Sequence, residues 1–405
     1  MKKIISAIAT LFALVPALTL NAGSGFTPFG KWRGVFLIRE GVEVPFNFEI
    51  QGKSIKDAKV YFLNAAEKFD GGRLTSRNDS LFISLDQFDN ELAFRIENNA
   101  LEGVLHKQDG SGSPIRVRAE QGKAYRFSEG TQQPAGDISG TYDIVFGKSD
   151  STIGLFTQEG NKLTATFLRV TGDSRYLEGI VDGNQFYLSS FIGSSPSYYK
   201  GSFNTDGTIS GELIGVRGSL PFAGKHNEDA TLPDLYSLTY LKKGYTRFDF
   251  SFPDLNEKQV SLTDAKYKGK VVIVAISGTW CPNCMDEAAF LSPWYKQNNK
   301  RGVEVITIYY ERKNDTAFAR KTIGRFGQKF DIKYDQVFGG LADKQYVANS
   351  LPSLNAFLSF PTTLFINKKG EVAKIHTGYT GPATGKYFTG FIKEFNEEVD
   401  RLLNE

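Results

Sequence analysis

Trp280-Cys281-Pro282-Asn283-Cys284 contains both cysteines of the 405-residue chain. The motif follows an apolar run, Val271 to Ile276, that is typical of a buried strand, and it precedes a segment, 285–291, with the composition of a helix. A Cys-x-x-Cys pair in the first turn of a helix, directly after a strand, indicates a redox pair rather than a metal knuckle.

The spacing of the two cysteines gives each thiol a different task. The unpaired N–H groups and the dipole at the start of a helix favour an anion, so Cys281 is expected to ionise more easily than a free cysteine. Cys284 lies one turn further along and is placed to attack a mixed disulfide formed by Cys281. Pro282 suits the first helical position, because the N–H that proline lacks would be unpaired there.

Half of a zinc site and a permanent disulfide are the two other interpretations of this motif. A structural zinc site needs four ligands, and the sequence has no second cysteine pair. The three histidines, His106, His226 and His376, are scattered along the chain, and we expect the first two at the surface or in turns. We therefore predict no metal site, and no cofactor beyond a redox-active disulfide of the two cysteines.

The length and net charge of the chain limit its number of domains and its type of partner. A chain of 405 residues is expected to form two or three domains. The formal net charge is +3, so no nucleic-acid partner is indicated.

The N-terminus has the pattern of a secretory signal peptide over residues 1–22. Two lysines precede a mostly apolar stretch, Ile4 to Leu20, and Ala22 provides a small residue for cleavage. An uncleaved anchor is the alternative, although the stretch is short for a spanning helix and contains Pro16. No later stretch is apolar enough to span a membrane. The sequence therefore predicts export to a periplasm, where disulfide chemistry is at home.

Residues 23–228 have the pattern of an antiparallel all-β region. Short strand candidates alternate with turn clusters such as Asp70-Gly71-Gly72, which favours a barrel or a sandwich. A weak internal repeat divides the region into 23–135 and 136–228, because Gly30-Lys31-Trp32 is matched by Gly140-Thr141-Tyr142 and Leu101–Leu105 by Ile209–Leu213. Chance similarity between aromatic strands is the alternative. No catalytic constellation is visible in either half.

From residue 247 the pattern changes to alternating strands and helices, after a connector, 229–246, that a short helix would fit. Beyond the cysteines we expect a strand over 303–310, a helix capped by Asn314, a hairpin over 362–376 and a last helix from about Thr384 to Leu403. The segment between Glu311 and Ser359 is expected to add a helix and a loop beside the site.

Three segments resemble the thioredoxin superfamily, and within it the TlpA/ResA-like extracytoplasmic thiol–disulfide oxidoreductases. They are Gly269–Val274, Gly278–Cys284 and Phe360–Gly370, and they stand in the family's order. The resemblance covers residues 250–405. It implies a thioredoxin-like α/β domain, 247–405, in which Cys281 attacks and Cys284 resolves. Together with the antiparallel β region that the strand and turn pattern predicts, this makes the chain an α+β multidomain protein.

The resemblance also implies which residues meet the substrate. Pro361 matches the family's cis-proline, and with Phe360 and Thr362 it would offer a strand edge to a substrate chain. Trp280 matches the tryptophan that borders the site.

Glu287 matches a glutamate that is common in this branch, three positions after the second cysteine on the same helical face. Its carboxylate would disfavour the Cys284 thiolate and relay the proton of that thiol. A solvated glutamate on the helix surface is the alternative. The Pro-Asn dipeptide between the cysteines departs from the family's usual pairs and leaves the redox potential open.

These patterns predict an extracytoplasmic protein disulfide reductase. Its substrates would be protein thiols and disulfides, and an unidentified protein would donate electrons. The alternatives are a dithiol oxidase or isomerase, and an envelope binding module with a thioredoxin-like dock. A thiol peroxidase is disfavoured, because Gly278 stands where its Thr-x-x-Cys site needs threonine.

Overall fold

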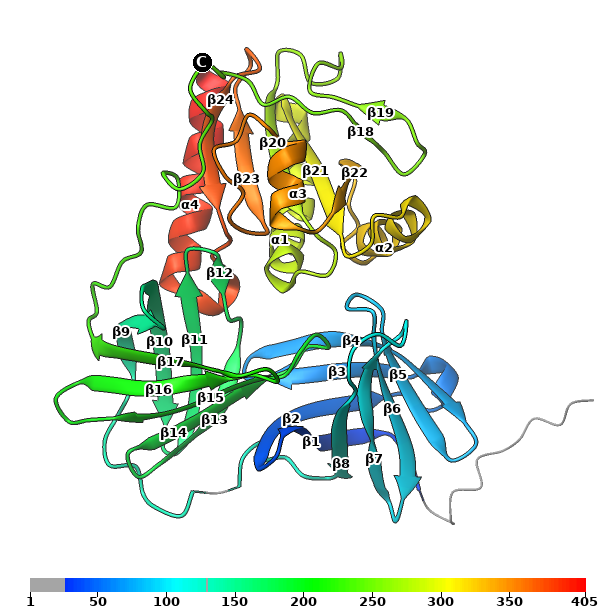
Figure 1. Ribbon diagram of the computed structural model, residues 1–405, viewed down its shortest axis with the longest axis vertical. Helices are drawn as coiled ribbons and strands as arrows, with labels where there is room; N and C mark the ends of the chain where they lie inside the picture. The colour runs from blue at the N-terminus through cyan, green and yellow to red at the C-terminus, as the bar shows by residue number, and fades with distance from the viewer. Residues whose placement is uncertain (1–25, 129) are drawn as a thin grey trace, which may run out of the picture.

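The computed structural model describes residues 26–128 and 130–405 (Figure 1). In the view of Figure 1, two antiparallel β structures lie side by side at the bottom and a mixed α/β unit lies above them. The predicted signal peptide, 1–22, falls outside the described residues. Among those residues, no helix has the length and apolar character needed to cross a membrane.

The first β structure, called here the first barrel, is closed and has eight antiparallel strands. β1 pairs with both β2 and β8, so the hydrogen-bonded ladder runs around the whole ring. Alternate side chains point inward, and Phe36 and Phe46 stack there with ring centroids 4.4 Å apart. The elements are β1 (Gly30–Arg39), β2 (Val42–Gln51), η1 (Ile55–Asp57), β3 (Lys59–Asn64), β4 (Glu67–Arg77), β5 (Ser80–Leu85), β6 (Asn90–Glu97), β7 (Ala100–Lys107) and β8 (Ile115–Gln121).

The second β structure, called here the second barrel, is a nine-stranded sheet that a pairing between β10 and β11 closes on itself. Its core is also aromatic, and Phe167 and Tyr199 stack in it with centroids 4.7 Å apart. The strands are β9 (Gly140–Phe146), β10 (Asp150–Glu159), β11 (Lys162–Arg169), β12 (Gly172–Asp173), β13 (Leu177–Asp182), β14 (Gln185–Ser190), β15 (Ser197–Phe203), β16 (Thr208–Ile214) and β17 (Ser219–His226).

The two barrels share one order of strands. Gly30 opens β1 and Gly140 opens β9, and both have a positive φ, +117° and +130°. The other matched segments, Leu101–Leu105 and Ile209–Leu213, lie in β7 and β16. β7 is next to β8, which pairs with β1, and β16 is next to β17, which pairs with β9. The predicted antiparallel class of this half is therefore confirmed, and its architecture is barrel-like rather than a sandwich.

The C-terminal unit is a five-stranded sheet in the order β22-β21-β20-β23-β24, with helices on both faces. β20 is apolar at almost every position because both faces are covered. Ile273 faces the layer that contains α1, α2 and α4, and Val274 faces the layer that contains α3. The thioredoxin-like α/β class predicted for this half is confirmed.

The bounds of the C-terminal elements follow the predicted alternation. They are β18 (Phe252–Pro253), β19 (Gln259–Val260), β20 (Val271–Ser277), α1 (Pro282–Asn298), η2 (Asn299–Arg301), β21 (Val303–Glu311), α2 (Thr316–Lys329), β22 (Asp335–Leu341), α3 (Lys344–Ser350), β23 (Thr362–Ile366), β24 (Val372–Thr377), η3 (Pro382–Thr384) and α4 (Lys386–Asn404).

Two local expectations are wrong. The connector 229–246, all of it described, forms turns and extended backbone without a helix, because its backbone pairs with the α/β unit, as in the bridge between Leu241 and Leu354. The cap of α2 is Asp315, not Asn314, and the Asp315 carboxylate accepts from the backbone N–H of Phe318.

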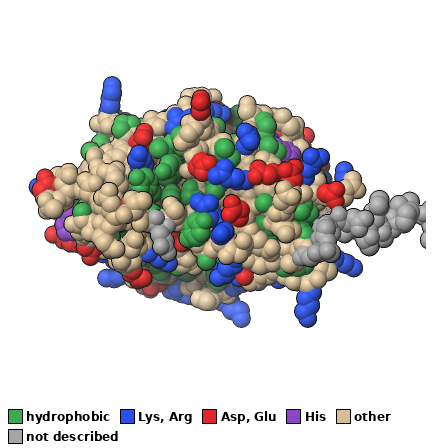
Figure 2. All heavy atoms as spheres, turned by 90° about the horizontal axis from the view of Figure 1, so that it is seen from below, with side chains coloured by type: hydrophobic (Ala, Val, Ile, Leu, Met, Phe, Trp, Pro, Cys, Tyr) green, Lys and Arg blue, Asp and Glu red, His purple; other side chains and the backbone are tan. Residues whose placement is uncertain are grey.

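Charged side chains of both signs are interspersed on the face of the molecule seen from below (Figure 2), in keeping with the net charge of +3.

Candidate active site

The two cysteines lie where the sequence places them, at the start of α1 directly after β20. Cys281 is the N-cap, with extended backbone (φ −94°, ψ 121°), and Pro282 is the first helical residue. The backbone N–H of Cys284 donates a hydrogen bond to the sulfur of Cys281 at 3.3 Å. Both thiols are free, and Cys281 is 6% exposed whereas Cys284 is fully buried. The N-cap sulfur therefore takes the place of the oxygen that usually satisfies a helix N–H.

The segment around Pro361 lies against Cys281. The Phe360–Pro361 peptide bond is cis. The thiol of Cys281 donates to the carbonyl oxygen of Phe360 at 3.5 Å. Thr362 is fully buried, and its hydroxyl donates to the carbonyl of Ser359 at 2.8 Å. The backbone at Phe360, rather than the Thr362 side chain, is therefore what this segment presents to the thiol.

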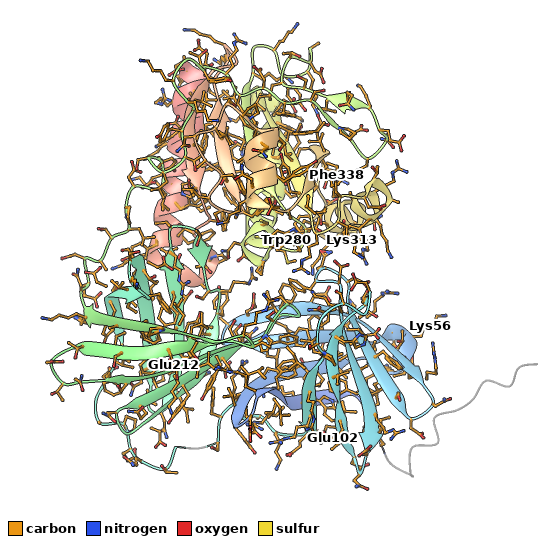
Figure 3. All side chains as sticks on the ribbon, in the orientation of Figure 1. Lys56, Glu102, Glu212, Trp280, Lys313 and Phe338 are labelled. Carbon is orange, nitrogen blue, oxygen red and sulfur yellow. The ribbon has the colours of Figure 1, made fainter. Side chains whose placement is uncertain are left out.

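Trp280 borders the same site from the other side. Its ring meets that of Phe360 edge to face, with centroids 5.3 Å apart, and its indole N–H donates to the carbonyl of Tyr310 at 3.0 Å. Figure 3 shows Trp280 at the lower edge of the α/β unit, which faces the two barrels. The structure thus brings together Trp280, Phe360 and Pro361 around Cys281.

Glu287 is not a solvated surface residue. Its side chain is 4% exposed, and its carboxylate accepts a hydrogen bond from the hydroxyl of Thr363 at 2.5 Å. Burial raises the pKa of Glu287 to about 8, against the lowering effect of the Thr363 hydroxyl. Burial, followed by the neighbouring Cys281 thiol and Glu287, also raises the pKa of Cys284. The buried thiol and the buried carboxyl both favour their protonated forms.

Two residues at the end of β21 belong to the site and were missed by sequence reasoning. The carboxylate of Glu311 accepts from the backbone N–H and the hydroxyl of Thr279, at 3.1 and 2.9 Å, and burial raises its pKa to about 7. The guanidinium of Arg312 lies 5.4 Å from the Trp280 ring centroid. A signal was available, because the carboxyl ends of adjacent parallel strands meet at one edge of a sheet.

Arg312 also connects the site to the first barrel. It donates to the carbonyl oxygen of Phe88 at 2.7 Å, and its charge interacts with Asp89, Glu311 and Cys281. Burial lowers the pKa of Arg312, and those three groups oppose the shift. A cation is thus held near the first cysteine by a contact outside the α/β unit.

Arg175 of the second barrel is a third residue of the site that sequence reasoning missed. It is 9% exposed, donates to the carbonyl of Pro282 at 3.0 Å, and forms ion pairs with Glu67 and Asp286. Burial raises the pKa of Asp286 to about 7 although Arg175 opposes the shift. One guanidinium therefore joins both barrels to the first turn of α1.

The Pro-Asn dipeptide between the cysteines contacts the second barrel. Gly172 has a φ of +125°, which strains other residues, and a Cβ atom there would lie 1.9 Å from the terminal amide group of Asn283. A cavity of about 230 Å³ opens beside this contact, and its walls are Cys281 to Asn283 on one side and residues of the second barrel, including Arg175 and Ser195, on the other. Cys284 does not line it.

The histidines lie apart from the cysteines. His106 is on β7 beside Glu91, and His226 ends β17 beside Glu228, both partly exposed as expected. His376 is buried on β24. Among the described residues, no group of three or more His, Cys, Asp or Glu side chains is arranged to hold a metal ion. The chemistry that this geometry offers is exchange between the Cys281 thiol and a disulfide, followed by attack from Cys284.

Known proteins resemble the part of the chain that carries this site. Residues 244–375 match the AhpC/TSA family. Thiol-disulfide oxidoreductase ResA of Geobacillus thermodenitrificans is 31% identical over 142 residues, which cover 35% of this chain and 72% of that protein. ResA of Bacillus subtilis is 27% identical over 140 residues, or 34% of this chain and 69% of that protein. A solved thiol:disulfide interchange protein of Chlorobium tepidum is 21% identical, covers 40% of this chain and 98% of its own, and has a TM-score of 0.30.

Proposed function

The chain belongs to the ResA family of thiol–disulfide oxidoreductases, and from that premise we propose that it is an extracytoplasmic protein disulfide reductase that works through Cys281 and Cys284. The observation that carries the proposal is the hydrogen bond from the Cys284 N–H to the Cys281 sulfur at the start of α1. The start of α1 thus donates directly to the sulfur proposed to attack, and the first cysteine of a Cys-x-x-Cys motif at such a position is characteristic of thiol–disulfide exchange.

In the first step, the Cys281 thiolate attacks one sulfur of a substrate disulfide. A bond forms between the two sulfurs, the substrate disulfide breaks, and its other sulfur leaves as a thiolate that takes a proton from water. Of the two cysteines, Cys281 alone lines the cavity next to the second barrel, which supports its role as the attacking thiol. The carbonyl oxygen of Phe360 lies 3.5 Å from the Cys281 sulfur, next to the atom that forms the new bond.

In the second step, Cys284 loses its proton and attacks the Cys281 sulfur. The Cys281–Cys284 disulfide forms and the substrate leaves as a second thiolate, so two electrons have passed from the enzyme to the substrate. The proton goes to Glu287 in its ionised form, which is a minor fraction of the molecules at pH 7 and half of them at the pKa of about 8. No cofactor takes part beyond the cysteine pair.

A dithiol on an electron-donor protein then reduces the pair. We propose that the chain reduces its substrates rather than oxidising them. The equilibrium reduction potential of the Cys281–Cys284 pair tests this direction: a value below about −220 mV favours a reductase and one near −120 mV an oxidase.

The N-terminal sequence supports an extracytoplasmic site of action. The two lysines and the apolar stretch of residues 1–22 have the composition of a signal peptide. Fractionation of cells that express the full chain, with N-terminal sequencing of the mature protein, tests this part. Retention of the whole chain inside the cytoplasm would contradict it.

A trapping experiment tests the roles of the cysteines. Cys284→Ala should accumulate mixed disulfides with envelope proteins, because the second step is blocked, and Cys281→Ser with Cys284→Ala should accumulate none. Mass spectrometry of the adducts identifies the substrates. If Cys284→Ala forms no adducts in its native envelope, the assigned roles are wrong. If Cys281→Ser retains the full cellular phenotype, a binding module with a redox-inert dock explains the chain better.

A further inference from the structure

A second cavity, of about 500 Å³, lies between the second barrel, the connector and α4, and neither cysteine lines it. Its volume falls within the range of about 300–1,000 Å³ that is usual for small-molecule sites. Figure 1 shows the connector leaving β17 and running beside α4. The apolar part of the wall includes Ile153, Leu168, Leu232, Tyr236, Tyr387 and Phe391.

His376 is the most deeply buried polar side chain of this wall, at 3% exposed, followed by Thr380 at 5%. It pairs with Thr363 across β23 and β24, so its side chain lies on the face of the sheet that α4 covers. Its ring packs between Tyr236 and Phe391, with centroids 4.9 and 5.0 Å away. Its Nδ1 lies 3.1 Å from the carbonyl oxygen of Gly378, and Nε2 has no hydrogen-bond partner in the part of the chain that the structure describes.

The Gly378 contact fixes the tautomer of His376. A carbonyl oxygen only accepts, so Nδ1 carries the hydrogen. Burial lowers the pKa of His376 to about 4, so the ring is neutral at pH 7. Nε2 therefore presents a lone pair, and a partner for it must be a hydrogen-bond donor.

Gly390 keeps the cavity open on the side of α4. It lies within the helix and lines the cavity, and a Cβ atom built there would meet no other atom within 4 Å. Glycine inside a helix costs about 1 kcal/mol relative to alanine. A larger side chain at this position would extend into empty space rather than into packed neighbours.

We propose that this cavity binds an uncharged, mostly apolar small molecule with one hydroxyl group, such as a phenol or an alcohol, and that the hydroxyl donates to Nε2 of His376. The apolar wall would contact the body of the ligand, and Nε2 of His376, which has no hydrogen on it, would accept the hydrogen bond from the ligand's hydroxyl. The lining carries charges of both signs, on Lys386, Asp234 and Glu394, so the cavity does not favour a ligand of either net charge.

A matched pair of probes tests the proposal on the full chain. 4-Propylphenol and 4-propylanisole have nearly the same shape, but only the phenol can donate. Isothermal titration calorimetry should show the phenol bound about 5-fold more tightly, the effect of one hydrogen bond. Equal affinities, or no binding of either probe, would overturn the proposal without any variant.

Three variants locate the binding. His376→Phe should bind both probes with a ratio near 1, because the acceptor is gone and the apolar wall remains. Gly390→Phe should abolish binding of both probes. Gly324→Phe is the matched control, since Gly324 is also a helical glycine at which an added Cβ atom would meet nothing within 4 Å, and it does not line the cavity. Binding that survives Gly390→Phe, or that Gly324→Phe abolishes equally, would place the probes elsewhere and refute the site.

Discussion

The hydroxyl of Thr363 donates a hydrogen bond of 2.5 Å to the carboxylate of Glu287, and this contact joins the strand after the cis-proline to the helix that carries both cysteines. Burial raises the pKa of Glu287 to about 8. The carboxyl therefore holds its proton at pH 7 and releases it slightly above, within the environment of Cys284. A proton donor and acceptor with this pKa is suited to the second step of disulfide exchange.

Glu287→Gln should slow that step. The amide keeps a hydrogen bond to Thr363 but cannot exchange a proton, so we expect turnover in the reduction of insulin disulfides to fall by roughly 10²-fold at pH 8. The inflection near pH 8 in the pH–rate profile should disappear as well. Glu398→Gln, at a buried glutamate of α4 that pairs with Arg401, is the control. An unchanged profile would show that water carries the proton.

The stability of the fold should also depend on pH. Burial raises the pKa of Glu287 to about 8, and it raises those of Asp286 and Glu311 to about 7. A carboxyl with a raised folded-state pKa binds more protons in the folded chain than in the unfolded one, so its contribution to stability is present at low pH and lost as pH rises through the folded pKa. His376, whose pKa is lowered, changes stability in the opposite direction, but only below about pH 6.5.

We therefore expect the free energy of unfolding to fall between pH 6.5 and 8.5. Glu287 contributes about 2 kcal/mol of this loss, from about 1.4 pKa units at 1.36 kcal/mol each. Urea unfolding of the wild type and of Glu287→Gln at both pH values measures the difference. In Glu287→Gln, the free energy of unfolding should fall with pH only by the amount due to Asp286 and Glu311. Parallel lines for the two proteins would mean that Glu287 is ionised in the folded state.

Local sequence patterns predicted the elements in which the spacing of apolar residues reflects which side chains are buried. β20 and α1 were predicted from an apolar run followed by the cysteine motif, and α4 from its helical period. β22 was not, because Phe338-Gly339-Gly340 has the composition of a turn. The strand forms by parallel pairing with β21, and Gly340, with φ +122°, accommodates the ring of Tyr346, which a Cβ atom would approach to 2.5 Å. Pairing in the folded state overrides the local preference there.

The residues of the candidate site also divide into those that local patterns predicted and those that depend on contacts in the folded chain. Cys281, Cys284 and Pro361 could be named from motifs, whereas Arg175 could not. Its contact with Pro282 spans 107 residues and joins two units, and no spacing rule covers such a distance. His376 was missed because a single histidine on an apolar strand is typical of a core residue.

Arg312 should promote the reactivity of Cys281. The guanidinium is fixed over Trp280 by its hydrogen bond to the Phe88 carbonyl, and a nearby cation stabilises a thiolate. We expect Arg312→Gln to slow alkylation of Cys281 by iodoacetamide at pH 6 by roughly tenfold, which corresponds to about 1.4 kcal/mol. Quenched alkylation followed by mass spectrometry gives the rate. Arg320→Gln, at an exposed arginine of α2 that pairs with Glu257, should change nothing. Equal slowing in both variants would indicate a general effect of net charge.

Arg175 should stabilise the chain more than any exposed ion pair. Arg175→Met leaves Glu67 and Asp286 buried without their cation, and the loss of one partner of a buried pair costs about 3–5 kcal/mol. Because the pKa of Asp286 is already about 7, protonation relieves part of this cost at pH 6, so the destabilisation should be larger at pH 8.5. Urea unfolding at both pH values measures it. Arg73→Met, which removes an exposed pair with Asp86, should cost less than about 1 kcal/mol. If the two variants unfold alike, the guanidinium of Arg175 is not what fastens the barrels to α1.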